Sequence, residues 1–304
     1  MNFKYKISKS LLKISQFLKP SKDGTLLDLI SFFLILLIGS NHPRRIKNIY
    51  KINNDIILNE YEKIKNTNLI CQRNKYKTVN LFVGDSHSEF FGRNFVNTDN
   101  NKFFLTFHTG PSTLAEFGSS PKMINRICKI TNFLYFYGLR RDKNINLIFC
   151  LGEIDVRIFF YQKLKIEKSF NNISDYNKYL SKNFFKNFRN LKKKLAQKKI
   201  GNVNFYFNDI VPPSNKKYYL PKNPKALHEI VSFNNFPNLG TIKNRIAYTK
   251  NLTQNMKTVL KNKKIKFLNL SKENNLPYLS KKNSIDGHHI TDFKLIQEIH
   301  KQIF

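Results

Sequence analysis

The chain has no tryptophan, only 11 glycines in 304 residues, and only 20 acidic residues against 53 lysines and arginines. This shortage of acidic residues gives a formal net charge of +33, which taken alone suggests nucleic acid or an anionic membrane as a partner. However, lysine, asparagine, isoleucine and phenylalanine are all abundant, a joint bias typical of an AT-rich genome. No RNA- or DNA-binding motif accompanies the charge, so we expect no specific nucleic-acid partner.

Cysteine is also scarce. The three cysteines, Cys71, Cys128 and Cys150, are odd in number and include no Cys-x-x-Cys pair, which argues against a disulfide framework. Cys150 lies within an apolar strand pattern and Cys128 on the apolar face of a helical pattern, so we expect both thiols to be buried. These features are compatible with a reducing compartment, and we expect a cytoplasmic protein that is in part membrane-associated.

No apolar run reaches the roughly 20 residues that a membrane-spanning helix needs. The nearest candidate, residues 26–38, is interrupted by Asp28 and Ser31 and lies in a basic N-terminal extension, residues 1–77. It predicts a buried or membrane-surface helix, with peripheral membrane contact through residues 1–40. A secretory signal is the weaker interpretation, because residues 38–40 form a poor cleavage site.

The remainder of the chain, residues 78–304, predicts one α/β domain. The hydrophobic fraction of 41% and the 28 phenylalanines are enough for a sizeable core. Helix-length segments alternate with short apolar runs. Two of these segments have apolar residues at helical spacing, over 184–195 and 252–260. Thr291 is the expected N-cap of the last helix. Five strands with crossover helices predict a parallel, doubly wound sheet. The expected strands are residues 79–83, 103–107, 145–151, 203–207 and 265–268.

Four polar blocks follow predicted strands or precede the last predicted helix: Gly-Asp-Ser-His-Ser at 84–88, His-Thr-Gly-Pro at 108–111, Gly-Glu-Ile-Asp at 152–155 and Asp-Gly-His-His at 286–289. Open α/β sheets bind ligands at the carboxyl ends of their strands. A nucleophilic serine needs a base, and the base needs a carboxylate to orient it. Ser86, Asp286 and His289 supply these groups in the order Ser, Asp, His.

In this order the blocks resemble those of the SGNH hydrolase superfamily, the GDSL esterases and lipases, over residues 78–304. The third block resembles that of a divergent bacterial subfamily. The resemblance implies a flavodoxin-like, three-layer α/β/α sandwich with a five-stranded parallel sheet, to which the N-terminal extension adds helix. It also implies a serine esterase that needs no metal and no organic cofactor.

The resemblance assigns roles to individual residues. Ser86 matches the nucleophile, and Asp286 and His289 match its triad partners, whereas His288 is expected to be a solvated loop residue. The backbone N–H groups of Ser86 and Gly110 match two oxyanion donors, the first at the start of a helix whose dipole favours negative charge. Without the resemblance, Ser86 is equally an ordinary helix N-cap and Gly110 a turn glycine.

The third block departs from the superfamily, because Ile154 stands where an asparagine supplies a third oxyanion donor. Losing one such donor typically costs about 10²–10³ in rate. Three explanations remain open: two oxyanion donors are enough for catalysis, another side chain supplies the third donor, or the protein has lost its hydrolytic activity. His87, His108, Glu153 and Arg157 are candidates for substrate binding, although Glu153 and Arg157 are also spaced for a mutual ion pair.

Three functions therefore remain open. The first is a serine esterase that hydrolyses an acyl or acetyl ester of a carbohydrate or lipid. The second is an O-acyltransferase in surface polysaccharide synthesis, and the third is a non-catalytic protein that binds a glycan or a partner. A two-metal phosphoesterase needs several Asp, His and Asn ligands from successive strand ends. The chain has no Gly-Asn-His-Asp block, so we expect no metal site.

Overall fold

A computed structural model describes residues 78–92, 102–109, 112–119, 121–133, 144–214, 239–261, 263–270, 276–280, 283, 290 and 292–303. The predicted N-terminal extension, with its apolar segment at 26–38, lies outside the described residues. In the part of the chain that is described, no helix is both long enough and apolar enough to cross a bilayer.

Five parallel strands form one sheet in the order β2-β1-β3-β4-β5, which confirms the predicted α/β class and all five predicted strands. Each strand is a nearly continuous apolar run, as expected for parallel strands that are covered on both faces. The strands are β1 (Thr78–Gly84), β2 (Lys102–His108), β3 (Asn144–Cys150), β4 (Val203–Asn208) and β5 (Lys266–Leu268).

The order of the strands reverses next to β1. The chain passes from β1 to β2 on one side and then crosses to β3 on the other side of β1. The carboxyl ends of β1 and β3 therefore border the topological switch point, where open α/β sheets bind their ligands. The first and third polar blocks of the sequence follow these two strands.

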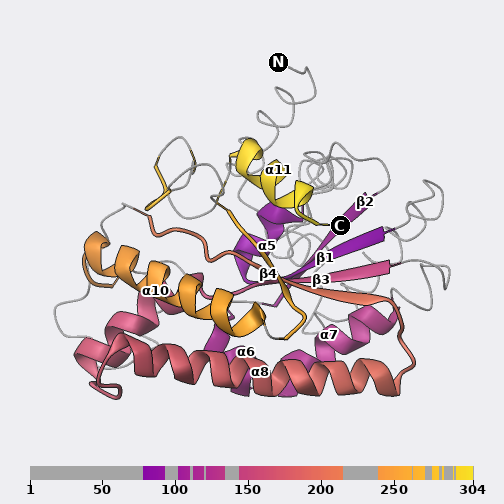
Figure 1. Ribbon diagram of the computed structural model, residues 1–304, viewed down its shortest axis with the longest axis horizontal. Helices are drawn as coiled ribbons and strands as arrows, with labels where there is room; N and C mark the ends of the chain where they lie inside the picture. The colour runs from indigo at the N-terminus through magenta and orange to yellow at the C-terminus, as the bar shows by residue number, and fades with distance from the viewer. Residues whose placement is uncertain are drawn as a thin grey trace, which may run out of the picture.

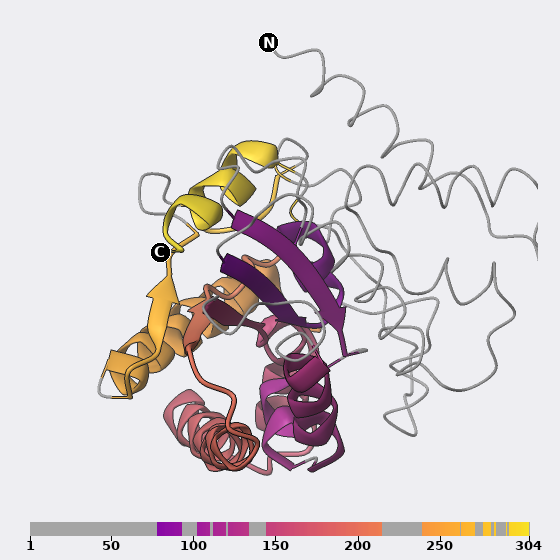
Figure 2. The same ribbon diagram turned by 90° about the vertical axis from the view of Figure 1, so that its right-hand side faces the viewer.

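Helices cover both faces of the sheet (Figures 1 and 2). One face carries α5 and α11, and the other carries α6, α7, α8 and α10. The helical segment that follows β3 contains two π-helical stretches, η3 and η4, a form that is often found at functional sites. The bounds are α5 (Ser86–Phe91), α6 (Leu114–Ser119), α7 (Pro121–Phe133), η3 (Asp155–Phe159), η4 (Gln162–Ile166), α8 (Ile173–Gln197), α10 (Ile242–Lys261) and α11 (Phe293–Lys301).

Alternate residues of the strands supply the two cores. Leu81 of β1 packs in the larger cluster with side chains of α7, α8 and α10, whereas Phe82 packs in the smaller one with α5 and α11. Cys128 belongs to the first cluster and Cys150 to the second, and both are free thiols, so their predicted burial is confirmed. Burial raises the pKa of the Cys150 thiol well above its ordinary value, which keeps it protonated.

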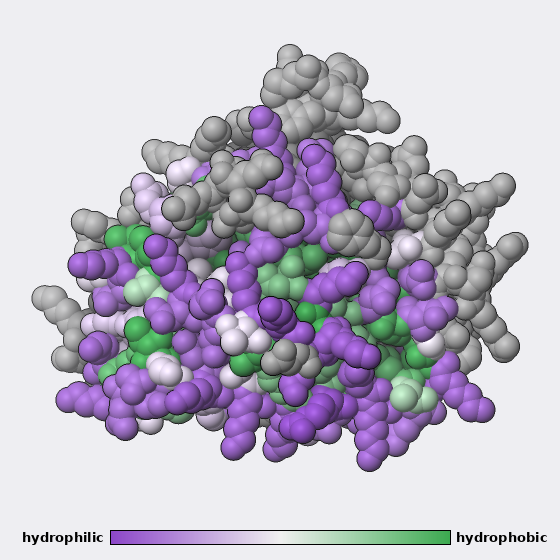
Figure 3. Space-filling view, viewed as in Figure 1, coloured by the Kyte–Doolittle hydropathy of each residue, from purple (hydrophilic) through white to green (hydrophobic). Residues whose placement is uncertain are grey.

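The predicted helices at 184–195 and 252–260 are confirmed as parts of the longer α8 and α10. The expected cap of the last helix is wrong by one residue. Asp292, not Thr291, is the N-cap of α11, and its carboxylate accepts from the backbone N–H of Lys294. The lysines of α8 point outward, and the lower edge of the surface in Figure 3, where α8 lies in Figure 1, is strongly hydrophilic.

Candidate functional site

The site begins where β1 and β3 end side by side. At Gly84, β1 lies so close to β3 that a Cβ atom would be 1.9 Å from the carbonyl oxygen of Cys150. Glycine is therefore required in the first block by the close approach of two backbones. The backbone N–H and the hydroxyl of Thr109 both donate to the Gly84 carbonyl, each at 2.8 Å. This carbonyl ties the end of β1 to the loop that follows β2.

Asp85, not Ser86, is the N-cap of α5. Its backbone is extended, and its Oδ1 accepts from the backbone N–H of His87 at 2.9 Å. The hydroxyl of Ser88 donates to the Asp85 carbonyl at 2.7 Å and closes the first turn. Ser86 is therefore the first residue of the helix, two residues after the end of β1, and it is half-buried. The interpretation of Ser86 as an ordinary N-cap is excluded.

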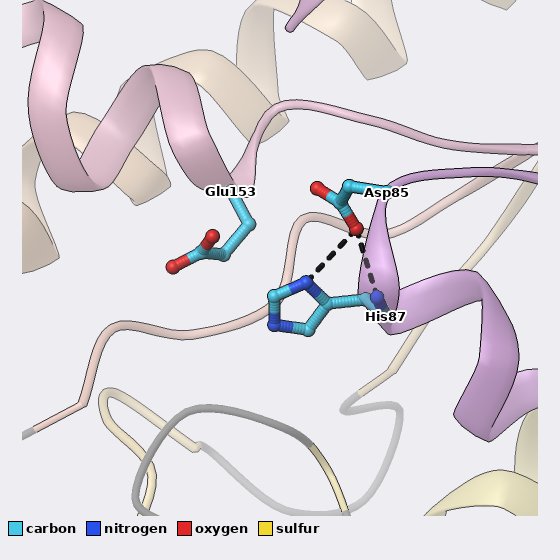
Figure 4. A group of neighbouring side chains, drawn as sticks. All are labelled: Asp85, His87 and Glu153. Carbon is cyan, nitrogen blue, oxygen red and sulfur yellow. Dashed lines mark hydrogen bonds and ion pairs between the residues drawn. The ribbon is translucent and has the colours of Figure 1, made fainter. Parts of the chain in front are cut away.

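His87 is buried and points back at the cap. Its Nδ1 lies 3.0 Å from Oδ1 of Asp85, so a hydrogen on Nδ1 is held by the carboxylate (Figure 4). Glu153 reaches the same place from the residues after β3 (Figure 4). One ligand-type atom from each of these three side chains lies within 4.8 Å of the other two. The first and third blocks thus meet at the switch point.

Glu153 and Arg157 form a buried ion pair. The Arg157 Nε lies 2.7 Å from Oε1 of Glu153, and less than a tenth of either side chain is exposed. The other carboxylate oxygen, Oε2, has no hydrogen-bond partner among the described residues. The guanidinium of Arg245 also interacts with this pair. Burial is the main cause that lowers its pKa, and the positive charge of Arg157 lowers that pKa further. The expected ion pair is present, and substrate contact by either residue stays a prediction.

Asp85, His87 and Glu153 are residue types that bind zinc, and they are the described residues that could hold a divalent cation. In the sequence, Asp85 and His87 form an Asp-x-His pair directly after an apolar strand. The prediction of no metal site did not take this pair into account. However, Oδ1 of Asp85 already receives two hydrogen bonds, and Oε1 of Glu153 is paired with Arg157. Arg157 thus supplies a positive charge to Oε1 of Glu153, whereas Oε2 of the same carboxylate has no partner among the described residues.

The third block turns sharply after β3 and buries its isoleucine. Gly152 has φ +106°, in the region that glycine tolerates and other residues avoid. Ile154 packs in a small apolar cluster with Ile158 and Leu239. At the place of the expected asparagine, this chain therefore has a packing residue.

Asp155, the last residue of the third block, holds the start of α6. Its Oδ2 accepts from the backbone N–H of Leu114 at 2.7 Å, and its side chain is fully buried. Burial is the main cause that raises its pKa to about 7, and the Leu114 N–H opposes that shift. Thr113 and Glu116 complete a capping box at the same helix end. This role of Asp155 was not predicted, although its place in the third block was the available signal.

The loop after β2 is consequently anchored at both ends. Thr109 is bonded to Gly84, the hydroxyls of Thr109 and Ser112 lie 2.7 Å apart, and Leu114 is bonded to Asp155. Residues 110 and 111, which lie between these anchors, are outside the described residues. The anchors come from the carboxyl ends of β1 and β3, the same two strands that present Ser86 and Glu153.

The structure places Ser86, His87, Glu153 and Arg157 after the carboxyl ends of β1 and β3. His108 ends β2, but its side chain is not described. The remaining expected site residues, Gly110, Asp286 and His289, lie outside the described residues, as does His288, which was expected to be a solvated loop residue. In comparisons with known proteins, no family model, no curated protein and no solved structure matches this chain.

Proposed function

We propose that this chain is a serine esterase of the SGNH type, on a flavodoxin-like α/β/α sandwich, that hydrolyses an acyl or acetyl ester of a carbohydrate or lipid. The observation that carries the proposal is the position of Ser86. It begins α5 two residues after the end of β1, at the switch point, and Asp85 performs the capping that would otherwise explain a serine there. The strand order, with β1 between β2 and β3, is that of flavodoxin-like sheets.

The residues around His289 support its role as the base. Ile290 follows His289 directly and is completely buried in the cluster that contains Phe90 and Phe91 of α5. Ile290, the residue after His289, therefore packs on the face of the sheet that carries α5. Asp286 stands three residues earlier, at a spacing that suits a carboxylate orienting the imidazole.

The mechanism is a two-step acyl transfer. The Oγ of Ser86 attacks the ester carbonyl while His289 takes its proton and Asp286 orients the imidazole. The backbone N–H groups of Ser86 and Gly110 hold the negative oxygen of the tetrahedral intermediate. As the intermediate collapses, His289 returns the proton to the leaving alcohol. Water, deprotonated by His289, then attacks the acyl-enzyme and releases the acid and free Ser86.

The burial of Ile154 favours one alternative, a non-catalytic protein that binds a glycan, because this residue supplies no oxyanion donor. An O-acyltransferase differs only in the final acceptor, a sugar hydroxyl in place of water. The reactivity of Ser86 distinguishes the non-catalytic protein from both enzymes. The O-acyltransferase is distinguished from the hydrolase by adding a sugar, because only a transferase would pass the acyl group to the sugar hydroxyl in place of water.

The test is labelling by a fluorophosphonate probe, which reacts with activated serines. We expect the full-length wild-type protein to be labelled and Ser86→Ala to remain unlabelled. Ser169→Ala is the matched control, because Ser169 is an exposed serine outside the site, and it should label like the wild type. Equal labelling of wild type and Ser86→Ala, or no labelling of either, would contradict the proposal.

A further inference from the structure

Asn208 is the last residue of β4, and its amide group is buried without a partner. The residue is 1% exposed, and neither Oδ1 nor Nδ2 has a hydrogen-bond partner among the described residues. In the described part of the chain it is the one side chain whose two polar atoms are both buried and unbonded. Native proteins rarely leave buried polar groups unpaired, so such a group calls for an explanation.

A second asparagine on the same strand and the same face shows what a structural asparagine does here. Asn204, four residues earlier, donates to Asn146 of β3 at 3.0 Å, and Asn146 donates to Asn80 of β1 at 2.7 Å. These three residues lie opposite one another in the register of the sheet and are linked by these two bonds, although Nδ2 of Asn80 has no partner among the described residues. Each asparagine of that row therefore has at least one partner in the sheet, whereas Asn208 has none among the described residues.

The row that contains Asn208 offers no such partners. Leu268 of β5 lies directly opposite it, and the register of β3 with β4 brings it level with Cys150. Cys150 in turn lies opposite Gly84 of β1. An aliphatic side chain, a protonated thiol and a glycine offer little hydrogen bonding to an amide. The described residues in this row therefore do not account for the asparagine.

The position of Asn208 relates it to Ser86. Asn208 faces the same side of the sheet as Tyr206, and Tyr206 packs in the cluster that includes side chains of α5. Ser86, which begins α5, follows Gly84 by two residues. Two strand spacings put the Cα atoms of Gly84 and Asn208 about 10 Å apart, with Cys150 between them. Ser86 and Asn208 therefore both lie at the carboxyl edge of the sheet, where open α/β sheets bind their ligands.

We propose that Nδ2 of Asn208 donates the third hydrogen bond to the oxyanion, in place of the donor that Ile154 lacks. This inference rests on the proposed esterase function and identifies a further catalytic residue for it. The amide comes from the end of β4 instead of the turn after β3. Its Nδ2 has two hydrogens that no described group accepts, and the oxyanion of the tetrahedral intermediate is a strong acceptor.

The test compares Asn208→Leu, Asn208→Ala and the control Asn204→Leu in the full chain, with p-nitrophenyl acetate as substrate. We expect Asn208→Leu to lower kcat by about 10²–10³-fold and to leave KM nearly unchanged, because the hydrogen bond forms fully only in the transition state. The thermal midpoint should stay the same or rise, because an apolar residue of similar size removes two unbonded buried atoms. Asn204→Leu should keep its kcat.

A loss of kcat without a loss of thermal stability is a result that a purely structural role does not produce. Asn208→Ala provides the same comparison if the leucine variant does not fold. If a folded Asn208 variant keeps wild-type kcat while fluorophosphonate still labels Ser86, this inference is wrong and the proposed function stands. If the wild type shows no Ser86-dependent labelling, the proposed function fails and this inference fails with it.

Discussion

The carboxylate of Asp155 and the backbone N–H of Leu114 are joined by a buried hydrogen bond of 2.7 Å that links the end of β3 to the start of α6. The loop between β2 and α6 carries Gly110, the expected second oxyanion donor. Its other end is bonded through Thr109 to Gly84, two residues before Ser86. The position of this loop relative to the nucleophile therefore depends on contacts with β1 and β3.

Replacing Asp155 tests this anchor. Asp155→Ala leaves the Leu114 N–H buried without an acceptor, which should lower the free energy of unfolding by about 1–3 kcal/mol. A shift of the loop should also reduce kcat by up to about 10²-fold. Asp155→Asn keeps an acceptor oxygen and should retain most of the free energy of unfolding and most of kcat. Urea denaturation and esterase kinetics measure the two effects, and equal behaviour of the two variants would count against the anchor.

The raised pKa of Asp155 predicts a pH dependence of stability. The group binds a proton up to about pH 7 in the folded protein but only up to the ordinary value of 3.8 when unfolded. Its contribution is therefore complete below pH 3.8 and is lost as the pH rises through about 7. Asp155→Asn cannot titrate, so the difference in unfolding free energy, wild type minus variant, should decrease over this window. A difference that increases with pH would show that the carboxylate is not buried as described.

The two neighbouring histidines of the fourth block should behave differently. His289→Ala removes the proposed base, and we expect it to abolish fluorophosphonate labelling of Ser86. His288→Ala is the matched control and should be labelled at a rate close to that of the wild type. Labelling is measured as a time course with both variants at equal concentration. The reverse pattern would assign the base to His288.

The buried pair of Glu153 and Arg157 predicts a strong asymmetry between single and double variants. Arg157→Met leaves a buried carboxylate without its cation and should cost about 3–5 kcal/mol of stability. Adding Glu153→Gln removes that carboxylate charge and should recover much of the loss. Chemical denaturation of the two singles and the double variant gives the coupling free energy. Additive effects would show that the two side chains do not form the pair in solution.

The five strands could be predicted because parallel strands covered on both faces read as continuous apolar runs, as residues 79–83 do. The first block could be found because Gly84 and Ser86 have specific backbone and chemical roles. Whether Asp85 or Ser86 caps α5 could not be predicted, since both residue types are good caps. The choice depends on which backbone is extended, and here it is that of Asp85.

Asp155 and Asn208 were not predicted for a different reason. The significance of Asp155 depends on Leu114, forty-one residues earlier, which lies beside it only after folding. The unsatisfied amide of Asn208 is evident only once its row neighbours, Cys150 and Leu268, are known. Such roles arise from contacts between distant segments, which a single sequence does not display. The π-helical stretches after β3 likewise follow no simple apolar period.

The most direct test of the account is to detect the acyl-enzyme. The full-length protein is mixed with p-nitrophenyl acetate and quenched in acid within the first turnover, and peptides are then mapped by mass spectrometry. We predict one acetyl group on Ser86 in the wild type, and none on that peptide in Ser86→Ala. Release of p-nitrophenol with no acetyl group on Ser86, or with the acetyl group on another residue, would contradict the claim that Ser86 is the nucleophile.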